Sequence, residues 1–261
     1  MKYPIYIPSK GRYNNCFSAN LLIEEKIDFS LVVQEKEYEL YKKSFPNINI
    51  IAIPQKEIDD YLLSNLWALP FTRTWIKKYS ESKNEKSHWQ LDDNISGLRQ
   101  VNKGKSKKCS TVFAFDHLNK FYDKYNNIGI MGLRHSAFAS FQPKPIQINQ
   151  QVYSFVLIKN FNNIYWRDNT IEDTDYSLQT LSSNYCTVLF NIFCFQKPST
   201  STLTGGNTDS VYKGDGRLIC ARKLQRDWPG IVKKITRKRG MPRILLNNIW
   251  SKYTTKLQNN E

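Results

Sequence analysis

The feature that most limits the possible folds is an alternation of short apolar runs and amphipathic segments in the first half of the chain. The runs at 3–8, 29–34 and 48–54 are rich in β-branched and aromatic residues and end at polar residues or proline. The segments between them, 14–26 and 35–44, have patterns compatible with helices. Strands and helices that alternate in this way predict an α/β fold, in which helices cover a mixed, mainly parallel sheet.

The same alternation continues to a strand at 128–133 and then changes to two long strands around one helix, followed by a basic, loop-rich final third. The further expected elements are a helical stretch over 55–82 interrupted at Pro70, a strand at HWQLDDN (88–94), a helix within 109–125, a strand at 128–133, long strands at 151–160 and 185–195, and a helix that begins near Glu172. We predict a core at 1–196. Residues 197–261 are expected to form a flexible loop (197–216) and a basic, loop-rich extension that packs on the same domain.

The charge of the chain indicates what kind of partner to expect. It has 38 Lys and Arg against 23 Asp and Glu, a formal net charge of +15, which predicts attraction to polyanions. Nucleic acid is the first candidate and a nucleotide-bearing substrate the second. A membrane surface is third, because no basic segment has a wide apolar face. Five scattered cysteines and no apolar run of membrane-spanning length indicate a soluble cytoplasmic protein with reduced thiols.

Three polar segments are expected at the carboxyl-terminal edge of the sheet, where α/β proteins bind ligands. The first is SKGR, directly after the first strand. It comprises Ser9, Lys10, Gly11 and Arg12, in which glycine allows close approach of the backbone and the two cations suit phosphate. The others are the pair Asp92–Asp93 at the end of the fourth strand and the acidic segment 166–181.

Asp92 and Asp93 place two like charges side by side. Mn²⁺ or Mg²⁺ bound to a diphosphate takes one or two carboxylates as ligands, so the pair is a candidate metal site. Side chains of adjacent strand residues point to opposite sides, so one carboxylate can reach a metal and the other a sugar hydroxyl. The alternative is an exposed turn formed with Asn94 and Gly97.

The acidic segment also has two interpretations. Thr170 and Asp173 have the spacing of a capping box, and carboxylates favour a helix N-terminus. The segment nevertheless holds more carboxylates than a cap needs, so one of them is a candidate general base. These carboxylates are Asp168, Glu172, Asp173 and Asp175. Among the histidines, His88 and His117 are expected to be structural, and His135 is expected near a site.

Basic residues gather in two further segments. The first is expected to be a loop and contains Lys103, Lys105, Lys107 and Lys108. The second lies near the C-terminus and contains Arg222, Lys223, Lys233, Lys234, Arg237, Lys238 and Arg239. A charged run is often only a solvated face, but an excess of this size beside a site predicts contact with a phosphate backbone. Arg73 is expected to be either a nucleotide contact or a helix-surface charge.

The order IPSKGR, QLDDN and IEDTDYSLQ resembles nucleotide-sugar-dependent glycosyltransferases of the GT-A fold. More specifically, it resembles the TET-associated DNA-base glycosyltransferases of bacteriophages, which are related to the enzymes that make base J. The resemblance covers about residues 3–195. It implies a Rossmann-like GT-A core, an inverting transfer from a UDP-sugar to a 5-hydroxymethylpyrimidine in double-stranded DNA, and action in the cytoplasm of an infected bacterium.

The resemblance also implies roles for individual residues. Residues 9–12 would bind the nucleotide, Asp93 would ligate Mn²⁺ or Mg²⁺ with Asp92 nearer the sugar, and Asp173, paired with Glu172, would be the base. This chain has no His after His135 to serve as a further metal ligand, which leaves Asp209, Asp215 or water. Candidates to stack on an extruded base are Phe138, Phe141, Tyr165 and Trp166.

Two other functions remain open from the sequence. One is a GT-A transferase that acts on a glycan or a lipid-linked acceptor. The other is a non-catalytic nucleic-acid-binding protein on the same scaffold. A monomer is expected in each case.

Overall fold

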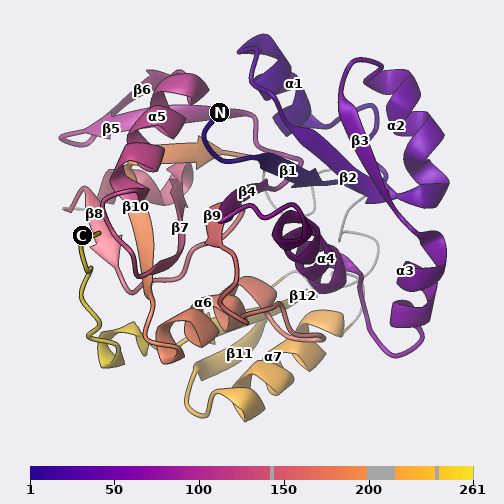
Figure 1. Cartoon of the computed structure of the whole chain (residues 1–261). Coiled ribbons are helices and arrows are strands. Elements are labelled where there is room, and N and C mark those ends of the chain that lie inside the picture. Colours follow the sequence, from indigo (N-terminus) through magenta and orange to yellow (C-terminus); the bar gives the residue numbers. More distant parts are fainter. Residues whose placement is uncertain (142–143, 199–214, 239–240, 261) are drawn as a thin grey trace.

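A single mixed sheet of ten strands organises the protein (Figure 1). The computed structural model describes residues 1–141, 144–198, 215–238 and 241–260. The strands of this sheet are β1 (Ile5–Pro8), β2 (Ser30–Gln34), β3 (Asn49–Ile53), β4 (Ser87–Leu91), β5 (Gly97–Asn102), β6 (Lys105–Cys109), β7 (Ile128–His135), β8 (Ile146–Ile148), β9 (Phe155–Lys159) and β10 (Cys186–Gln196). Their order across the sheet is β3-β2-β1-β4-β9-β7-β10-β5-β6, and β8 pairs with β10.

Helices cover both faces of the sheet. Among the described residues they are α1 (Phe17–Glu24), α2 (Tyr38–Ser44), α3 (Gln55–Leu62), α4 (Leu69–Ser82), α5 (Thr111–Tyr122), α6 (Glu172–Ser182) and α7 (Gly216–Asp227), with short 3-10 turns η1 (Glu35–Glu37), η2 (Ser136–Phe141) and η3 (Trp250–Lys252). Buried side chains of α1, α2 and α5 pack on one face, and those of α3, α4 and α6 pack on the other. The predicted α/β class is therefore confirmed.

The alternation along β1 shows how the two cores arise. Ile5 and Ile7 are buried in the cluster formed with α1, α2 and α5, whereas Tyr6 between them belongs to the cluster with α3 and α4. Successive strand residues point to opposite faces, so a strand covered on both sides is apolar throughout. This explains why the sequence shows continuous apolar runs here.

Strand direction creates one edge that is rich in loops. β1 is parallel to β2 and β4, and β7 is parallel to β10. β9 lies between β4 and β7 and is antiparallel to both. β1, β4, β7 and β10 therefore end at the edge where β9 begins. The candidate site is built at this edge.

Three predictions about local structure were wrong in whole or in part. The helical stretch over 55–82 is interrupted as predicted, between α3 and α4, but Pro70 is not the break itself, because it lies in the first turn of α4, where its missing N–H costs nothing. The lysine-rich segment is not a loop, since β5 and β6 form a hairpin whose two turn residues, Lys103 and Gly104, both have positive φ, 47° and 76°. The C-terminal part is not mainly loop, because it contains α7 and a ribbon of β11 (Val232–Lys238) and β12 (Met241–Leu246).

The C-terminal elements lie beside α6 (Figure 1). Leu178 of α6 is fully buried in one cluster with Leu224 of α7, Ile231 and Ile249. This apolar contact couples the C-terminal elements to the helix that carries the acidic segment. The division at residue 196 stays a prediction. No helix among the described residues combines the length and apolar character needed to cross a membrane.

Candidate active site

The SKGR segment and the aspartate pair meet because β1 and β4 are parallel neighbours. Ser9 Oγ donates to Asp93 Oδ2 at 2.8 Å, and the Arg12 guanidinium forms an ion pair with Asp93 Oδ1. Tyr41 of α2 joins them, with its hydroxyl 2.6 Å from Ser9 Oγ. Gly11, at φ 65°, turns the chain beyond β1, and Lys10 is exposed. The structure thus brings these two sequence motifs into direct contact.

Asp93 is a buried carboxylate, 5% exposed. Burial raises the pKa of Asp93 above its ordinary value, although Arg12 and Ser9 act in the opposite direction. Both of its oxygens have partners within the protein. Asp93 therefore holds the 9–12 loop in place through its contacts with Ser9 and Arg12.

Asp92 faces a different set of cations. Its Oδ1 accepts from Arg73 Nη2 at 2.7 Å and its Oδ2 is 3.3 Å from Lys197 Nζ. Burial alone would raise the pKa of Asp92, but Lys197 and Arg73 bring it below the ordinary value. Asp92 is therefore ionised at neutral pH and lies between two positive charges.

Arg73 enters the site from the first half of α4. Its side chain is buried, Nη1 contacts Gln90 Oε1 at 3.3 Å, and its guanidinium lies 6.0 Å from the Trp166 ring. Burial disfavours the charged form, but Asp92, Asp173 and Glu172 raise the pKa of Arg73 above its ordinary value. The interpretation of Arg73 as a helix-surface charge was wrong, since its guanidinium is buried and interacts electrostatically with three nearby carboxylates.

Glu172 and Asp173 form the first turn of α6 and complete the cluster. Glu172 is buried, whereas Asp173 is partly exposed. Burial raises the pKa of Glu172 well above its ordinary value, and Asp173 raises it further. Burial also raises the pKa of Asp173, to about 6, against the opposing effects of Arg73, Lys197 and a hydrogen bond with Glu172. Asp173 is thus a carboxylate that accepts protons near neutral pH.

The other acidic residues of this segment have structural partners. Asp168 accepts from the Tyr61 hydroxyl at 2.6 Å. Asp175 is fully buried and binds Arg167, Gln179 Nε2 at 2.7 Å and Trp228 Nε1 at 2.7 Å. The predicted capping box is absent, because α6 has no side-chain cap and the Thr170 hydroxyl has no partner.

The contacts of the four carboxylate oxygens of Asp92 and Asp93 show whether this pair fits the predicted metal ion. Asp92 contacts Arg73 and Lys197, and Asp93 contacts Arg12 and Ser9. Among the described residues, no group of three or more His, Cys, Asp or Glu is arranged to hold a metal ion. A divalent ion here would lie beside protein cations that already compensate the carboxylates. As arranged, these residues do not fit the predicted metal.

The two proposed substitute ligands give no further support for a metal. Asp209 lies outside the described residues. Asp215 is exposed and forms an ion pair with Arg237 at 2.8 Å.

Comparison with known families identifies the chain. The sequence profile of the TET-associated glycosyltransferases matches residues 3–206, which is more than half of the chain. The protein belongs to this family. It is therefore a glycosyltransferase, and its reaction requires a sugar donor. A search of curated proteins found no similar sequence.

Sequence reasoning missed two residues of this TET-associated glycosyltransferase. Lys197 follows β10 and contacts both Asp92 and Ser154, the residue before β9. Ser154 also fixes the aspartate pair through its carbonyl, which accepts from the Asp92 N–H at 2.7 Å. The rule that ligands lie beyond strand ends applies to β10 as well, so Lys197 was detectable from the predicted strand 185–195.

The histidines match their predicted placement. His88 is buried between Asn160 and Gln90 at 2.9 and 3.0 Å, and His117 bonds the backbone of its own helix. His135 ends β7 at the site edge, 5.3 Å from the Phe195 ring.

The predicted base-stacking aromatics differ in availability. Trp166 is buried and stacks on Tyr176 at 4.1 Å, so its proposed role was wrong. Tyr165 donates to Glu81, and the cations of Lys77 and Lys78 lie over its ring. Phe138, in η2 beside the site edge, is 55% exposed. The side chain of Phe141 lies outside the described residues.

The predicted DNA-binding residues fall into two β-ribbons and a helix. All four hairpin lysines are exposed on β5, β6 and their turn. Of the C-terminal group, Arg222, Lys233 and Lys234 are exposed, Lys223 pairs with Asp227, and Arg237 pairs with Asp215. The Lys238 side chain and Arg239 lie outside the described residues.

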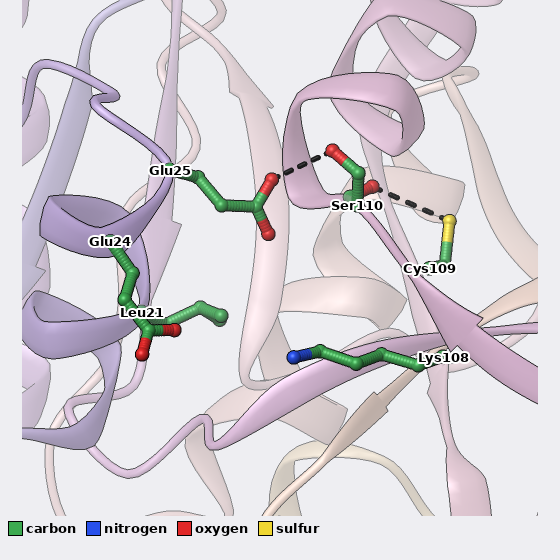
Figure 2. Close-up of a pocket in the computed structure, with 6 residues that line it drawn as sticks. All are labelled: Leu21, Glu24, Glu25, Lys108, Cys109 and Ser110. Carbon is green, nitrogen blue, oxygen red and sulfur yellow. Dashed lines mark hydrogen bonds between the residues drawn. The ribbon is translucent and has the colours of Figure 1, made fainter.

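A separate depression lies where α1 ends beside the β6–α5 junction (Figure 2). In it Glu25 accepts from Ser110 Oγ at 2.7 Å and from the backbone N–H groups of Thr111 and Val112. The N–H groups of the first turn of a helix have no acceptor within the helix, and Glu25 supplies one for α5. α1 begins at the aspartate pair, where the Ser18 N–H donates to the Asp93 carbonyl, and ends here. Glu25 therefore caps a helix and does not belong to the catalytic cluster.

Proposed function

We propose that this TET-associated glycosyltransferase moves a sugar from a nucleotide-sugar, UDP-linked, to the hydroxyl of a 5-hydroxymethylpyrimidine in double-stranded DNA. The observation that carries the proposal is Asp173, a partly exposed carboxylate beside Arg73 and Asp92 at the ligand-binding edge of the sheet. Raising a carboxyl pKa to about 6 matches a general base that works near neutral pH. We assign the core to the GT-A type and place the reaction in the cytoplasm.

The proposed transfer is a single displacement with inversion. An Asp173 oxygen takes the proton of the acceptor hydroxyl while the hydroxyl oxygen bonds to the anomeric carbon. The bond from the anomeric carbon to the diphosphate oxygen breaks, and its electron pair leaves with the diphosphate. The nearby cations Arg73 and Lys197 support this step because both favour the ionised form of Asp173, which takes the proton.

The nucleotide half of the donor is assigned to the 9–12 loop. Ser9 and Arg12 are fixed by Asp93, and exposed Lys10 extends from the same loop toward solvent. A loop held in this way loses little conformational entropy when it binds a nucleotide. Asp92, which is ionised and close to Asp173, is assigned to orient the sugar. The proposed reaction uses no metal ion, because the carboxylates as arranged do not fit one.

The assignment of DNA as acceptor rests on the basic surface. The four exposed lysines of the β5–β6 hairpin, together with Arg99 opposite Lys108, gather positive charge on one ribbon. Arg99 donates to Ser106 Oγ at 2.6 Å, so its guanidinium is held on the hairpin. Lysines also protect an exposed sheet edge, and a phosphate backbone would be attracted to the same charges. The 3-10 turn η2, which carries Phe138, contacts β5 and β10 and so lies between this hairpin and the site.

The test is a transfer assay on defined duplexes. Duplexes that contain hydroxymethylcytosine or hydroxymethyluracil are incubated with UDP-sugars, and the DNA is analysed by mass spectrometry. We expect a mass gain of one sugar on the modified base and none on a matched unmodified duplex. Sugar transfer only to a glycan or lipid-linked acceptor would refute DNA as the substrate. DNA binding without transfer to any acceptor would favour the non-catalytic interpretation.

A further inference from the structure

Lys197 occupies a built position in the site. It follows β10, its ammonium donates to Ser154 Oγ at 2.7 Å, and it lies 3.3 Å from Asp92 Oδ2. The ammonium also lies over the rings of Tyr153 and Phe195, 5.7 Å from the centroid of each ring. The side chain is 20% exposed. A lysine held by a hydroxyl, a carboxylate and two rings is fixed in place, while one side stays open to a ligand.

Lys197 and Arg73 share one carboxylate between them. Arg73 Nη2 is 2.7 Å from Asp92 Oδ1 and its side chain is 2% exposed. Arg73 Nε is buried and has no hydrogen-bond partner. Asp173 and Glu172 also lie near Arg73, but once Asp173 has taken the acceptor proton, two fixed cations face the ionised Asp92 and can attract another anion. In the proposed reaction, that anion is the departing diphosphate.

We propose that Lys197 and Arg73 provide the positive charge for the diphosphate, so that donor binding and sugar transfer proceed without a divalent metal. This inference rests on the proposed function. The Lys197 ammonium binds the phosphate oxygen that receives the electron pair of the broken bond. The acceptor proton goes to Asp173, as before. Lys197 follows β10, and Arg73 reaches from α4 to Asp92 beyond the end of β4, so both cations lie at the edge where nucleotides bind in α/β sheets.

The first arm of the test measures UDP binding by calorimetry, with EDTA or with Mn²⁺. We expect the affinity of the wild-type protein for UDP to differ by less than about threefold between the two conditions, since fixed protein cations bind phosphate without a metal. In EDTA, Lys197→Met should bind UDP at least about tenfold more weakly, because it keeps most of the side-chain length and removes the charge. Lys86→Met, an exposed lysine at the opposite end of β4, is the matched control and should bind like wild type.

The second arm measures sugar transfer under the same two conditions. Transfer by the wild-type protein in EDTA supports the inference. UDP binding and transfer that appear only with Mn²⁺ would overturn it. UDP binding in EDTA without transfer to any DNA would instead count against the proposed acceptor and leave the diphosphate site standing. The comparison of the wild-type protein in EDTA and in Mn²⁺ tests the inference even if the Lys197→Met variant fails to fold, which circular dichroism would reveal.

Discussion

Glu172 and Asp173 are neighbours in one helical turn, but their environments give their protons different properties. Glu172 is buried, and its pKa is raised well above the ordinary value by burial and by Asp173. Asp173 is partly exposed and has a pKa of about 6, because Arg73 and Lys197 oppose the effect of burial. A buried carboxyl with a strongly raised pKa favours the neutral form, whereas a partly exposed carboxyl beside two cations can serve as the ionised base. This assigns the base to Asp173 and a positioning role to Glu172.

The first prediction follows from that assignment. A base must be ionised, so kcat should rise as the pH increases through about 6 and then level off. Asp173→Asn should lower kcat by about 10²–10⁴-fold and abolish this pH dependence. Glu172→Gln resembles the protonated glutamic acid and should change kcat by less than about tenfold at neutral pH.

Rate measurements on a hydroxymethylated duplex at several pH values provide the check, with UDP affinity measured in parallel to show that both variants bind the donor. If Glu172→Gln lost more activity than Asp173→Asn, the assignment of the two roles would be reversed.

At this scale the sequence identified the residue types but not their partners. It predicted an acidic excess at the start of α6, and the structure places three carboxylates in the first turn of this helix and Asp168 before it. It had no means of showing that Asp175 binds Trp228, 53 residues away, or that Asp168 binds Tyr61, 107 residues away. Lys197 was overlooked because it appeared as the first residue of a long polar loop and not as the end of a strand.

Among the elements, α5 depends on a cap supplied from another helix end. Glu25 accepts from Ser110 Oγ (Figure 2) and from the N–H groups of Thr111 and Val112 at 2.7 and 3.1 Å. Burial would raise the pKa of Glu25, but these hydrogen bonds lower it below its ordinary value. A carboxylate at a helix N-terminus also interacts favourably with the helix dipole.

The second prediction is that Glu25→Gln lowers the free energy of unfolding by about 1 kcal/mol at neutral pH, the usual value of a lost N-terminal cap. Because the folded pKa is lowered, the stabilisation is present above the pKa of the unfolded chain, about 4.3. It is lost as the pH falls through the lower folded value. Urea denaturation at pH 7 and below pH 4 provides the measurement.

Glu24→Gln is the control for this prediction, since Glu24 is exposed in the same depression. It should leave stability unchanged within about 0.5 kcal/mol. Equal losses for the two variants would contradict a specific cap, and a Glu25 effect that persists below pH 4 would contradict its dependence on charge. Sugar transfer should be unaffected once the protein is folded.

Elements were predictable where apolar patterning dominates and less so where charge hides the pattern. The strands at 3–8, 29–34 and 48–54 were located to within two residues, because β1 and β2 are almost entirely buried and β3, at the sheet edge, is still a nearly continuous apolar run. The β5–β6 hairpin was predicted as a loop because exposed lysines conceal a strand. Its signal was the pair Lys103–Gly104, a two-residue turn with positive φ at both positions.

Across the whole molecule, the site follows from strand order. Because β1 and β4 are parallel neighbours, the motifs that follow them had to meet, and the sequence was sufficient to predict this. The insertion of antiparallel β9 between β4 and β7 was not predictable, since direction in a sheet depends on pairing between distant segments. That insertion brings Ser154 to Asp92 and, with it, Lys197.

The last prediction concerns how the net charge of +15 is used. If the hairpin contacts phosphates, each lysine that does so contributes about 0.9 to the slope of log affinity against log salt concentration. Lys105→Gln/Lys107→Gln removes two charges from one face of β6, and should therefore lower the slope by about 2 for any DNA sequence. UDP affinity should not change, because these lysines are exposed on the hairpin and do not contact the catalytic cluster. Fluorescence anisotropy with a labelled duplex at several salt concentrations measures the slope.

Lys83→Gln/Lys86→Gln is the matched control, because it removes the same charge from exposed residues before β4, at the edge opposite the site. Its salt slope should equal that of the wild type if binding is localised on the hairpin side. Equal reductions in both double variants would mean that DNA senses only the total charge of the protein. An unchanged slope in the hairpin variant would shift the DNA contact to the other basic ribbon, which carries the exposed Lys233, Lys234, Arg237 and Arg243.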